Sequence, residues 1–238
     1  MTKPKILIWD IETKPNLGYV WGKYDQNVIA FKEEWELLSV AWKWLGDSKV
    51  HCVTTEGKKS DLELCRQVHS LLSEADIAIA HNGDEFDVKK VKARMVAHRL
   101  EPLPPLTTID TKKVAKKYFN FTSNSLNDLG KTLGLGKKVQ TGGFDLWLDC
   151  MAGKKEAWAK MAKYNRQDVV LLEKVFNRMK PWMDKAILIG STLKHCPHCE
   201  SEDVRRDGIR GNGTTVKQEW ECNSCKKYFR TPLRRALN

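Results

Sequence analysis

The chain has 238 residues, of which 41% are hydrophobic, and it carries a formal net charge of +11. This composition excludes a disordered chain, and no apolar run approaches the roughly 20 residues that a membrane-spanning helix needs. The first residues lack the long apolar stretch of a signal peptide, so a cytoplasmic protein without a membrane partner is expected. The basic balance favours a polyanionic partner, most simply nucleic acid.

The first half of the chain alternates short apolar runs with segments of helical spacing. Strands are predicted at residues 6–11, 37–44, 50–54, 77–80 and 108–111, and helices at residues 61–72 and 87–98. The remainder up to residue 183 is mainly helical, with glycine-rich breaks and one helix over residues 155–179. Strands early and helices late indicate an α/β domain with a mixed sheet.

The composition changes near residue 190, where apolar residues become fewer and cysteines appear. Gly190, Ser191 and Thr192 are predicted to form a linker. Two domains are therefore predicted, at residues 1–188 and 192–238.

Asp10 and Glu12 lie two residues apart at the end of the first predicted strand. The strand period of two places both side chains on one face of the sheet. Two like charges that emerge from a buried strand are costly, and a divalent cation would offset that cost. The alternative is a strand that runs out into solvent, where acidic residues are common.

Asp87 closes the segment His81–Asp87, which follows the predicted strand at residues 77–80 and leads into a helix. In the alternative without a functional role, Asn82 or Asp84 caps the helix and Phe86 belongs to the core. Asp87 would then be an acid in the first turn, favoured by the helix dipole.

Tyr164 and Asp168 lie four residues apart within the predicted helix at residues 155–179, so they share one face of it. An apolar stripe adjoins that face, and Asp168 is expected at the core boundary. The alternative for Asp168 is a structural salt bridge, for example to a lysine.

These three segments in this order resemble the motifs of the DEDD superfamily of exonucleases. The first motif, D-x-E, is present as Asp10 and Glu12, and the second, N-x-x-x-F-D, as Asn82 to Asp87. The third, Y-x-x-x-D, is present as Tyr164 to Asp168 and is typical of the tyrosine-type, DnaQ-like branch. The resemblance covers about residues 3–180 and implies the RNase H-like fold, a mixed sheet flanked by helices, which is shared with the proofreading domains of DNA polymerases.

The resemblance implies a 3′→5′ exonuclease that releases nucleoside 5′-monophosphates from DNA, with single strands or 3′ ends as substrate. It implies a site for two Mg²⁺ or Mn²⁺ ions in which Asp10 is a ligand of both. Glu12 and Asp168 would be ligands of one ion, and Asp87 would bind the other, partly through water. Such ions prefer oxygen ligands and stabilise the negative charge that phosphodiester hydrolysis develops. Tyr164, whose ordinary pKa is about 10, is expected to act as a neutral hydrogen-bonding group that orients the nucleophile.

The C-terminal segment contains two C-x-x-C pairs separated by 22 residues, which resemble a zinc ribbon. Four thiolates suit one structural Zn²⁺, and the metal supplies folding energy that so short a segment cannot draw from a core. His195 and His198 are weaker candidates as ligands, and a redox pair is the alternative. The predicted ligands are Cys196, Cys199, Cys222 and Cys225, whereas Cys52, Cys65 and Cys150 are expected to be buried thiols.

Other readings of the same sequence stay open. The same chemistry could act on RNA 3′ ends, or the fold could serve as a non-catalytic scaffold that binds nucleic acid. The LGLGKK segment, which ends in Lys137 and Lys138, resembles the family but has no legible role, and lysine clusters of this kind are often only solvated surfaces. Trp21, Tyr24 and Trp35 could stack on bases, but most aromatic residues are core, so no site role is assigned to them. Arginines and lysines of the zinc ribbon are expected to aid substrate binding.

Overall fold

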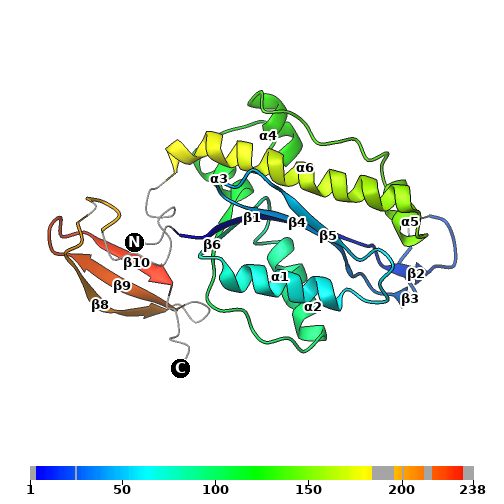
Figure 1. Ribbon diagram of the computed structural model, residues 1–238, viewed down its shortest axis with the longest axis horizontal. Coiled ribbons are helices and arrows are strands. Elements are labelled where there is room, and N and C mark those ends of the chain that lie inside the picture. The colour runs from blue at the N-terminus through cyan, green and yellow to red at the C-terminus, as the bar shows by residue number, and fades with distance from the viewer. Residues whose placement is uncertain (1–3, 25, 184–195, 200, 212–215, 233–238) are drawn as a thin grey trace.

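The computed structural model describes residues 4–24, 26–183, 196–199, 201–211 and 216–232. Its N-terminal part is a five-stranded mixed sheet with helices on both faces (Figure 1). The strands of this part are β1 Ile6–Thr13, β2 Leu17–Tyr19, β3 Ala30–Glu33, β4 Leu37–Trp44, β5 His51–Thr54, β6 Ile77–Ala80 and β7 Thr107–Asp110. Its helices are α1 Leu62–Glu74, α2 Asp87–Ala97, α3 Thr111–Tyr118, α4 Leu126–Thr132, α5 Asp145–Met151, α6 Lys155–Met179 and the short 3-10 helix η1 Lys180–Trp182.

The strand order of the main sheet is β5-β4-β1-β6-β7. The central strand β1 pairs antiparallel with β4 and parallel with β6, and β6 pairs parallel with β7. Strands β1 and β6 therefore end at the same edge of the sheet, which is where Asp10 and the segment before Asp87 lie. The predicted α/β class with a mixed sheet is confirmed.

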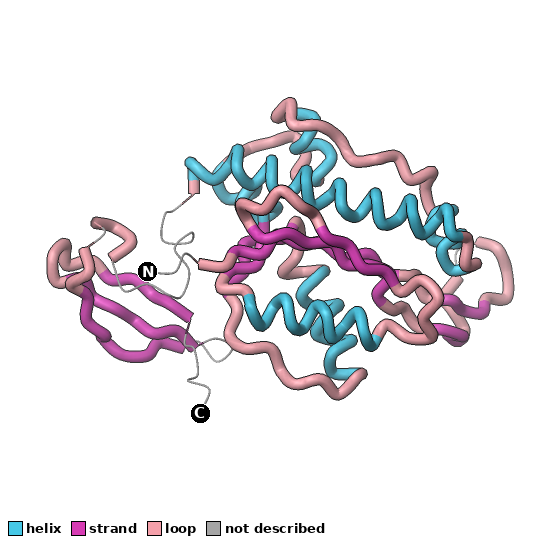
Figure 2. The backbone as a smooth tube through the Cα atoms, viewed as in Figure 1, coloured by secondary structure: helices cyan, strands magenta, loops and turns pink. Residues whose placement is uncertain are grey.

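Helices cover both faces of the sheet (Figures 1 and 2), and buried apolar side chains form a core on each face. Leu7, Trp9 and Ile11 of β1 pack with α1 and α2, whereas Ile8 packs with α3, α4 and α6 on the opposite face. The strand period of two then assigns Asp10 and Glu12 to the α6 face, where the 25-residue helix α6 crosses β1 and β4.

Most predicted elements in this part are confirmed, including the long helix at Lys155–Met179. The sequence did not predict strands β2 and β3, which form a separate two-stranded sheet. In the sequence, this hairpin lies between β1 and β4. Its apolar residues remain exposed, so they show no alternation of buried and exposed positions from which a half-buried strand could be recognised.

The C-terminal part is a three-stranded antiparallel sheet of order β10-β9-β8, formed by β8 Val204–Gly211, β9 Val216–Cys222 and β10 Tyr228–Pro232. The predicted linker at residues 190–192 lies outside the described residues, as do His195 and the predicted domain boundary. Within the described ranges, no helix is long and apolar enough to cross a membrane.

Candidate active site

Three carboxylates from β1 and α6 meet on one face of the main sheet. Asp10 lies opposite Ala41 of β4, and Glu12 lies opposite Ser39, so both acids are held within the central strand pair. Carboxylate oxygens of Asp10, Glu12 and Asp168 all lie within 4.8 Å of one another. Residues separated by more than 150 positions in sequence therefore form one cluster.

Asp87 is the fourth acid and enters from the start of α2. It is buried, with 2% of its surface exposed, and its Oδ1 accepts a hydrogen bond of 3.2 Å from the backbone N–H of Ile11. Phe86, not Asn82 or Asp84, precedes the helix, and no side chain caps it. The alternative that made Phe86 a core residue is wrong, since 38% of its surface is exposed.

Lys138 is a functional candidate to which the sequence assigned no role. Its Nζ lies 2.6 Å from Asp168 Oδ2 and 3.2 Å from the hydroxyl oxygen of Tyr164. The salt bridge that was the alternative for Asp168 is thus present, but one ammonium cannot neutralise four adjacent carboxylates. Burial is the largest single influence and works to lower the pKa of Lys138. The charges of Asp168 and Asp10 and the hydrogen bond to Asp168 together outweigh burial and raise that pKa, so Lys138 stays protonated.

The loop that precedes Lys138 packs closely against α4 at Gly130. A Cβ at this position would lie 2.7 Å from the carbonyl oxygen of Gly136 and 2.9 Å from Leu171 Cδ1 of α6. Gly136 itself has a φ of +122°, which L side chains rarely adopt. The loop therefore packs tightly between α4 and α6, and the backbone N–H of Lys138 donates to Asn127 Oδ1 at 3.1 Å. This gives the LGLGKK segment a structural role in placing its last lysine.

Asn165 is a second residue for which the sequence gave no role. Its Nδ2 donates a hydrogen bond of 2.8 Å to Asp10 Oδ2, and Ser39 Oγ donates one of 2.8 Å to Asn165 Oδ1. The bond from Ser39 fixes which way the amide points, so its N–H₂ side faces Asp10. Asn165 and Ser39 are both fully buried, and they orient Asp10 from the side of α6 and β4.

Tyr164 lies one helical turn from Asp168 on the same face of α6, as the spacing predicts. Its hydroxyl oxygen accepts from Lys138, so its own proton is available for donation. Burial raises the pKa of Tyr164 above its ordinary value, which keeps the hydroxyl neutral at physiological pH. Trp147 of α5 packs edge-on against the ring, with centroids 6.2 Å apart.

The acidic cluster is electrostatically strained in the absence of a cation. Burial, together with Asp87 and Glu12, raises the pKa of Asp10 well above its ordinary value. Burial and Asp168 raise the pKa of Glu12 to about 8, and burial raises the pKa of Asp87 to about 7. Like charges in a site removed from water favour the protonated forms.

These residues fit a divalent metal centre. In the described part of the chain, Oδ1 of the fully buried Asp168 has no hydrogen-bond partner, whereas its Oδ2 forms the ion pair with Lys138. Hard divalent cations take carboxylate oxygens as ligands and would compensate the repulsion that raises these pKa values. The arrangement can therefore hold metal ions between β1, α2 and α6.

The raised pKa values predict how stability depends on pH without added Mg²⁺ or Mn²⁺. Glu12 and Asp87 titrate higher in the folded chain than in the unfolded chain, so the folded state binds more protons, and its stability falls as pH rises. We expect the Tm, followed by circular dichroism, to fall between about pH 5 and about pH 8. Added Mn²⁺ should raise the Tm most at the alkaline end, and a rise in Tm with pH in the metal-free chain would contradict the prediction.

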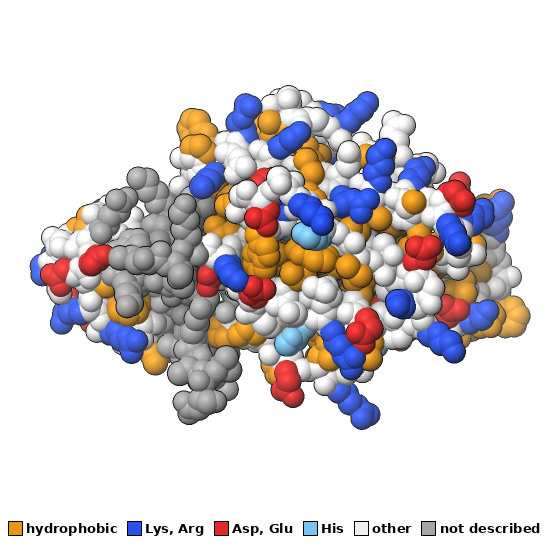
Figure 3. Space-filling view, in the orientation of Figure 1, with side chains coloured by type: hydrophobic (Ala, Val, Ile, Leu, Met, Phe, Trp, Pro, Cys, Tyr) orange, Lys and Arg blue, Asp and Glu red, His pale blue; other side chains and the backbone are white. Residues whose placement is uncertain are grey.

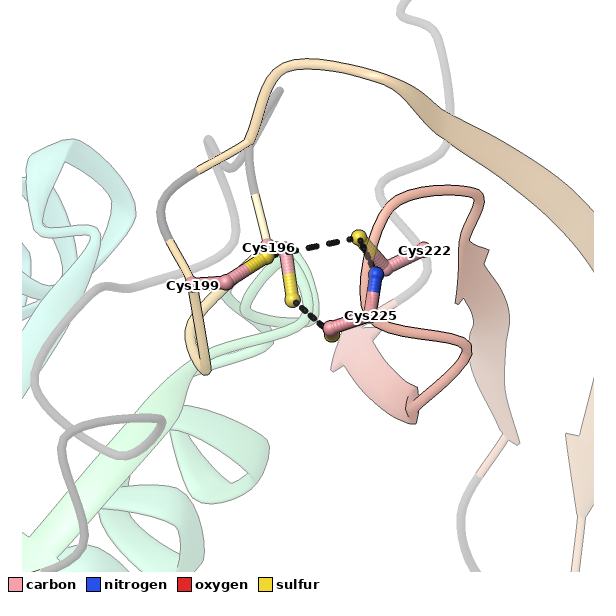
Figure 4. Close-up of side chains that lie close together, drawn as sticks. All are labelled: Cys196, Cys199, Cys222 and Cys225. Atoms are coloured by element: carbon pink, nitrogen blue, oxygen red, sulfur yellow. Dashed lines mark hydrogen bonds between the residues drawn. The ribbon is translucent and has the colours of Figure 1, made fainter.

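Four cysteines converge in the C-terminal part, as predicted (Figure 4). Cys196 and Cys199 precede β8, whereas Cys222 ends β9 and Cys225 lies in the turn before β10. The sulfur atoms of Cys196 and Cys225 are 3.5 Å apart, and those of Cys199 and Cys222 are 3.6 Å apart. A tetrahedral Zn²⁺ with Zn–S bonds of about 2.3 Å places its sulfurs about 3.8 Å apart, so the cluster suits that metal.

Backbone N–H groups also point at these sulfurs. His198 donates to Cys196 Sγ, and Cys225 donates to Cys222 Sγ, each at 3.4 Å. The bond from Cys225 lowers the pKa of Cys222 to about 6, which favours the thiolate that a metal requires. Of the other cysteines, Cys65 and Cys150 are buried as expected, and Cys52 is half-buried.

Several basic residues of the C-terminal sheet already form ion pairs within the sheet, so they are less available for phosphate contacts than the sequence indicates. Arg210 and Arg230 both form ion pairs with Glu219, at 2.6 and 2.7 Å, and Arg205 pairs with Glu221. These glutamates lie on β9, between the strands that carry the arginines. An arginine that is already paired makes a weaker phosphate contact, because the existing ion pair must first be broken.

A further group of potential ligands, Asp61, Cys65 and His98, has a structural role. Asp61 is buried and accepts two hydrogen bonds from Arg94, at 2.8 and 2.7 Å, and one from the backbone of Leu37. His98 Nε2 lies 2.6 Å from Asp61 Oδ1. These contacts join α1, α2 and β4, so the carboxylate is already compensated.

The family comparison agrees with this fold. A family model described as the RNase_H superfamily matches residues 9–180, and the chain belongs to that superfamily. No curated protein matches the chain. Among solved structures, the chain is similar to the family B DNA polymerase from the hyperthermophilic archaeon Pyrobaculum calidifontis, with 15% identity and a TM-score of 0.58. The match covers 78% of this chain and 25% of the polymerase.

Proposed function

We propose that this protein is a 3′→5′ exonuclease that hydrolyses DNA phosphodiester bonds and releases nucleoside 5′-monophosphates. The observation that carries the proposal is the convergence of Asp10, Glu12 and Asp168 within 4.8 Å, with Asp87 beside Ile11. Membership of the RNase H superfamily and the fold shared with a DNA polymerase support it. The three sequence motifs support the tyrosine-type DEDD subclass.

The proposed metal centre would hold two Mg²⁺ or Mn²⁺ ions. Asp10 would contact both ions, Glu12 and Asp168 one of them, and Asp87 the other. When bound, such ions stabilise the charge on the attacking and leaving oxygens of the phosphodiester. Asn165 holds Asp10 in one orientation, Lys138 pairs with Asp168 as long as no metal ion is bound there, and the Tyr164 hydroxyl would orient the nucleophile.

Tyr164→Phe tests the role of that hydroxyl. The substitution keeps the ring against Trp147 and deletes one hydrogen-bonding group. If the hydroxyl acts mainly in the transition state, kcat should fall on the order of 10-fold or more while KM changes little. Steady-state release of labelled mononucleotide measures both constants, and an unchanged kcat would make Tyr164 a packing residue.

The polarity and substrate of cleavage need a separate test. Linear single-stranded DNA labelled at its 5′ end should give a ladder that shortens from the 3′ end with Mg²⁺ or Mn²⁺, and none with chelator. Circular single-stranded DNA should stay intact, so rapid cutting of the circle would indicate an endonuclease. RNA of the same sequence distinguishes the RNA 3′-end alternative, and no cleavage of any substrate would favour a non-catalytic scaffold.

The C-terminal part is proposed to be a zinc ribbon, residues 192–238, that follows an exonuclease domain at residues 1–188. One Zn²⁺ bound by Cys196, Cys199, Cys222 and Cys225 would stabilise its three strands. We propose that it aids the binding of long substrates, because the acids of the catalytic cluster all lie before residue 170.

A further inference from the structure

The hairpin formed by β2 and β3 exposes an unusual number of aromatic side chains. The exposed fractions are 90% for Trp21, 78% for Tyr24, 59% for Tyr19 and 54% for Phe31. The hairpin pairs with no other strand, and both of its strands are exposed along their whole length. Two-stranded hairpins gain little stability alone, and clustered exposed apolar residues mark binding surfaces.

The base of the hairpin is fixed beside the acidic cluster. Lys14 follows the last two residues of β1, its backbone N–H donates to the carbonyl of Glu36, and Asn16 Oδ1 accepts from the backbone of Trp35. The segment therefore leaves β1 after Thr13, one residue beyond Glu12, and returns to the adjacent strand β4. These contacts fix the root of the hairpin beside Glu12, and the exposed aromatic residues extend from that root.

A concavity connects the root of the hairpin with α5. Thr13, Lys14 and Pro15 form one wall, and Phe144 and Trp147 form the other, around an open space of about 390 Å³. Trp147 also touches Tyr164, so this space adjoins the acidic cluster. Hydrophobic side chains reach the surface at the end of the molecule where β2 and β3 lie (Figure 3).

The charges of the hairpin indicate which part of a nucleic acid it contacts. Residues 14–36 contain three lysines and four acidic residues. Lys14 is already paired with Glu33 and Glu36, at 3.6 and 3.0 Å. A surface without excess positive charge does not attract phosphates, whereas exposed aromatic rings bind bases of any sequence by stacking.

We propose that Trp21, Tyr24 and Phe31 stack on bases of an unpaired strand whose 3′ end lies at the acidic cluster, with Phe144 and Trp147 as the opposite wall. This inference rests on the proposed function, since it places the 3′ end at Asp10. It gives a physical reason for a substrate that is single-stranded near its end, because the faces of paired bases are not available to the hairpin. It also assigns a role to Trp21 and Tyr24, for which the sequence gave none, whereas Trp35 packs against the core.

The test measures the binding of a fluorescent single-stranded oligonucleotide by anisotropy. The full chain carries Asp10→Asn, so that the oligonucleotide stays intact. Adding Trp21→Ala and Tyr24→Ala should weaken binding on the order of 10-fold or more. The slope of log Kd against log salt should not change, because no phosphate contact is lost. Trp182→Ala is the matched control. Trp182 is 69% exposed and lies just after the C-terminal end of α6, so this substitution should leave binding unchanged.

A second arm changes the nucleic acid instead of the protein. Replacing the bases near the 3′ end with abasic sites should weaken binding to the chain that keeps Trp21 and Tyr24, and should have little further effect once both are alanine. Unchanged affinity in the double variant, or an equal loss with Trp182→Ala, would overturn the proposal and leave the hairpin as a contact for a protein or a second copy. Hydrolysis of the p-nitrophenyl ester of thymidine 5′-monophosphate by the unmodified chain tests the proposed function separately, because this substrate has no neighbouring bases.

Discussion

Asp10→Asn and Asp168→Asn are each expected to abolish most cleavage while the chain stays folded. Each substitution removes a proposed metal ligand but keeps the shape of the side chain. The rate of mononucleotide release should fall on the order of 10²-fold or more, at least as much as losing one transition-state contact in other enzymes. Without added metal the variants should be as stable as the parent or more so, because one buried charge is removed from a cluster with raised pKa values.

Glu63→Gln is the matched control for these substitutions. Glu63 is an exposed acid on α1 that pairs with Arg66, one turn along the same helix. Its replacement should alter neither cleavage nor metal dependence, which separates the loss of a ligand from a general loss of negative charge. Near-normal cleavage by purified Asp10→Asn or Asp168→Asn would contradict the assignment.

Cys222→Ser is expected to remove zinc and unfold the C-terminal sheet. Bound Zn²⁺ contributes on the order of 10 kcal/mol to the folding of small Cys₄ units, and the apolar core around Cys196, Cys222 and Phe229 is small. Zinc content by mass spectrometry should fall from one equivalent per chain toward zero. Binding of long single-stranded DNA should weaken with a shallower salt dependence, while short oligonucleotides are still cut at high enzyme concentration.

Cys52→Ser provides the comparison for the zinc experiment. Cys52 lies in β5 of the main sheet, outside the cysteine cluster. A serine at this position can still donate a hydrogen bond to Asn165, as the Cys52 thiol does weakly. This variant should retain one zinc ion. Full zinc content in Cys222→Ser would contradict the ligand assignment, and unchanged DNA affinity in a zinc-free chain would indicate that the C-terminal part docks a protein or only caps the fold.

Much of the fold was predictable because its strands and helices are locally consistent. Three elements can be recognised from the sequence alone. They are the apolar runs of β1 and β6 and the long helix α6, whose apolar residues recur with the helical period. The acids were recognisable because each belongs to a short motif at the end or on the face of such an element. The hairpin of β2 and β3 was not, since exposed apolar residues lack the alternation that marks a strand.

The supporting residues of the site were harder to find, because their partners are distant in sequence. Asn165 contacts Asp10 across 155 positions, and Ser39 contacts Asn165 across 126. The sequence around Lys138 does not show that this lysine pairs with Asp168, because Lys137 and Lys138 could equally be two solvent-exposed lysines. One signal was available: Gly134 and Gly136 before two lysines indicate a tight loop, and such a loop can hold a lysine against a neighbouring helix.

The most direct measurement of the central claim is anomalous diffraction at the manganese edge from crystals soaked with Mn²⁺ and a deoxynucleoside 5′-monophosphate. The two-metal centre predicts two anomalous peaks about 3.5–4 Å apart. One peak should lie among Asp10, Glu12 and Asp168, and the other between Asp10 and Asp87, with Lys138 displaced from Asp168. Crystals that bind the nucleotide but show no manganese within coordinating distance of Asp10 would contradict a metal-dependent nuclease built on these carboxylates.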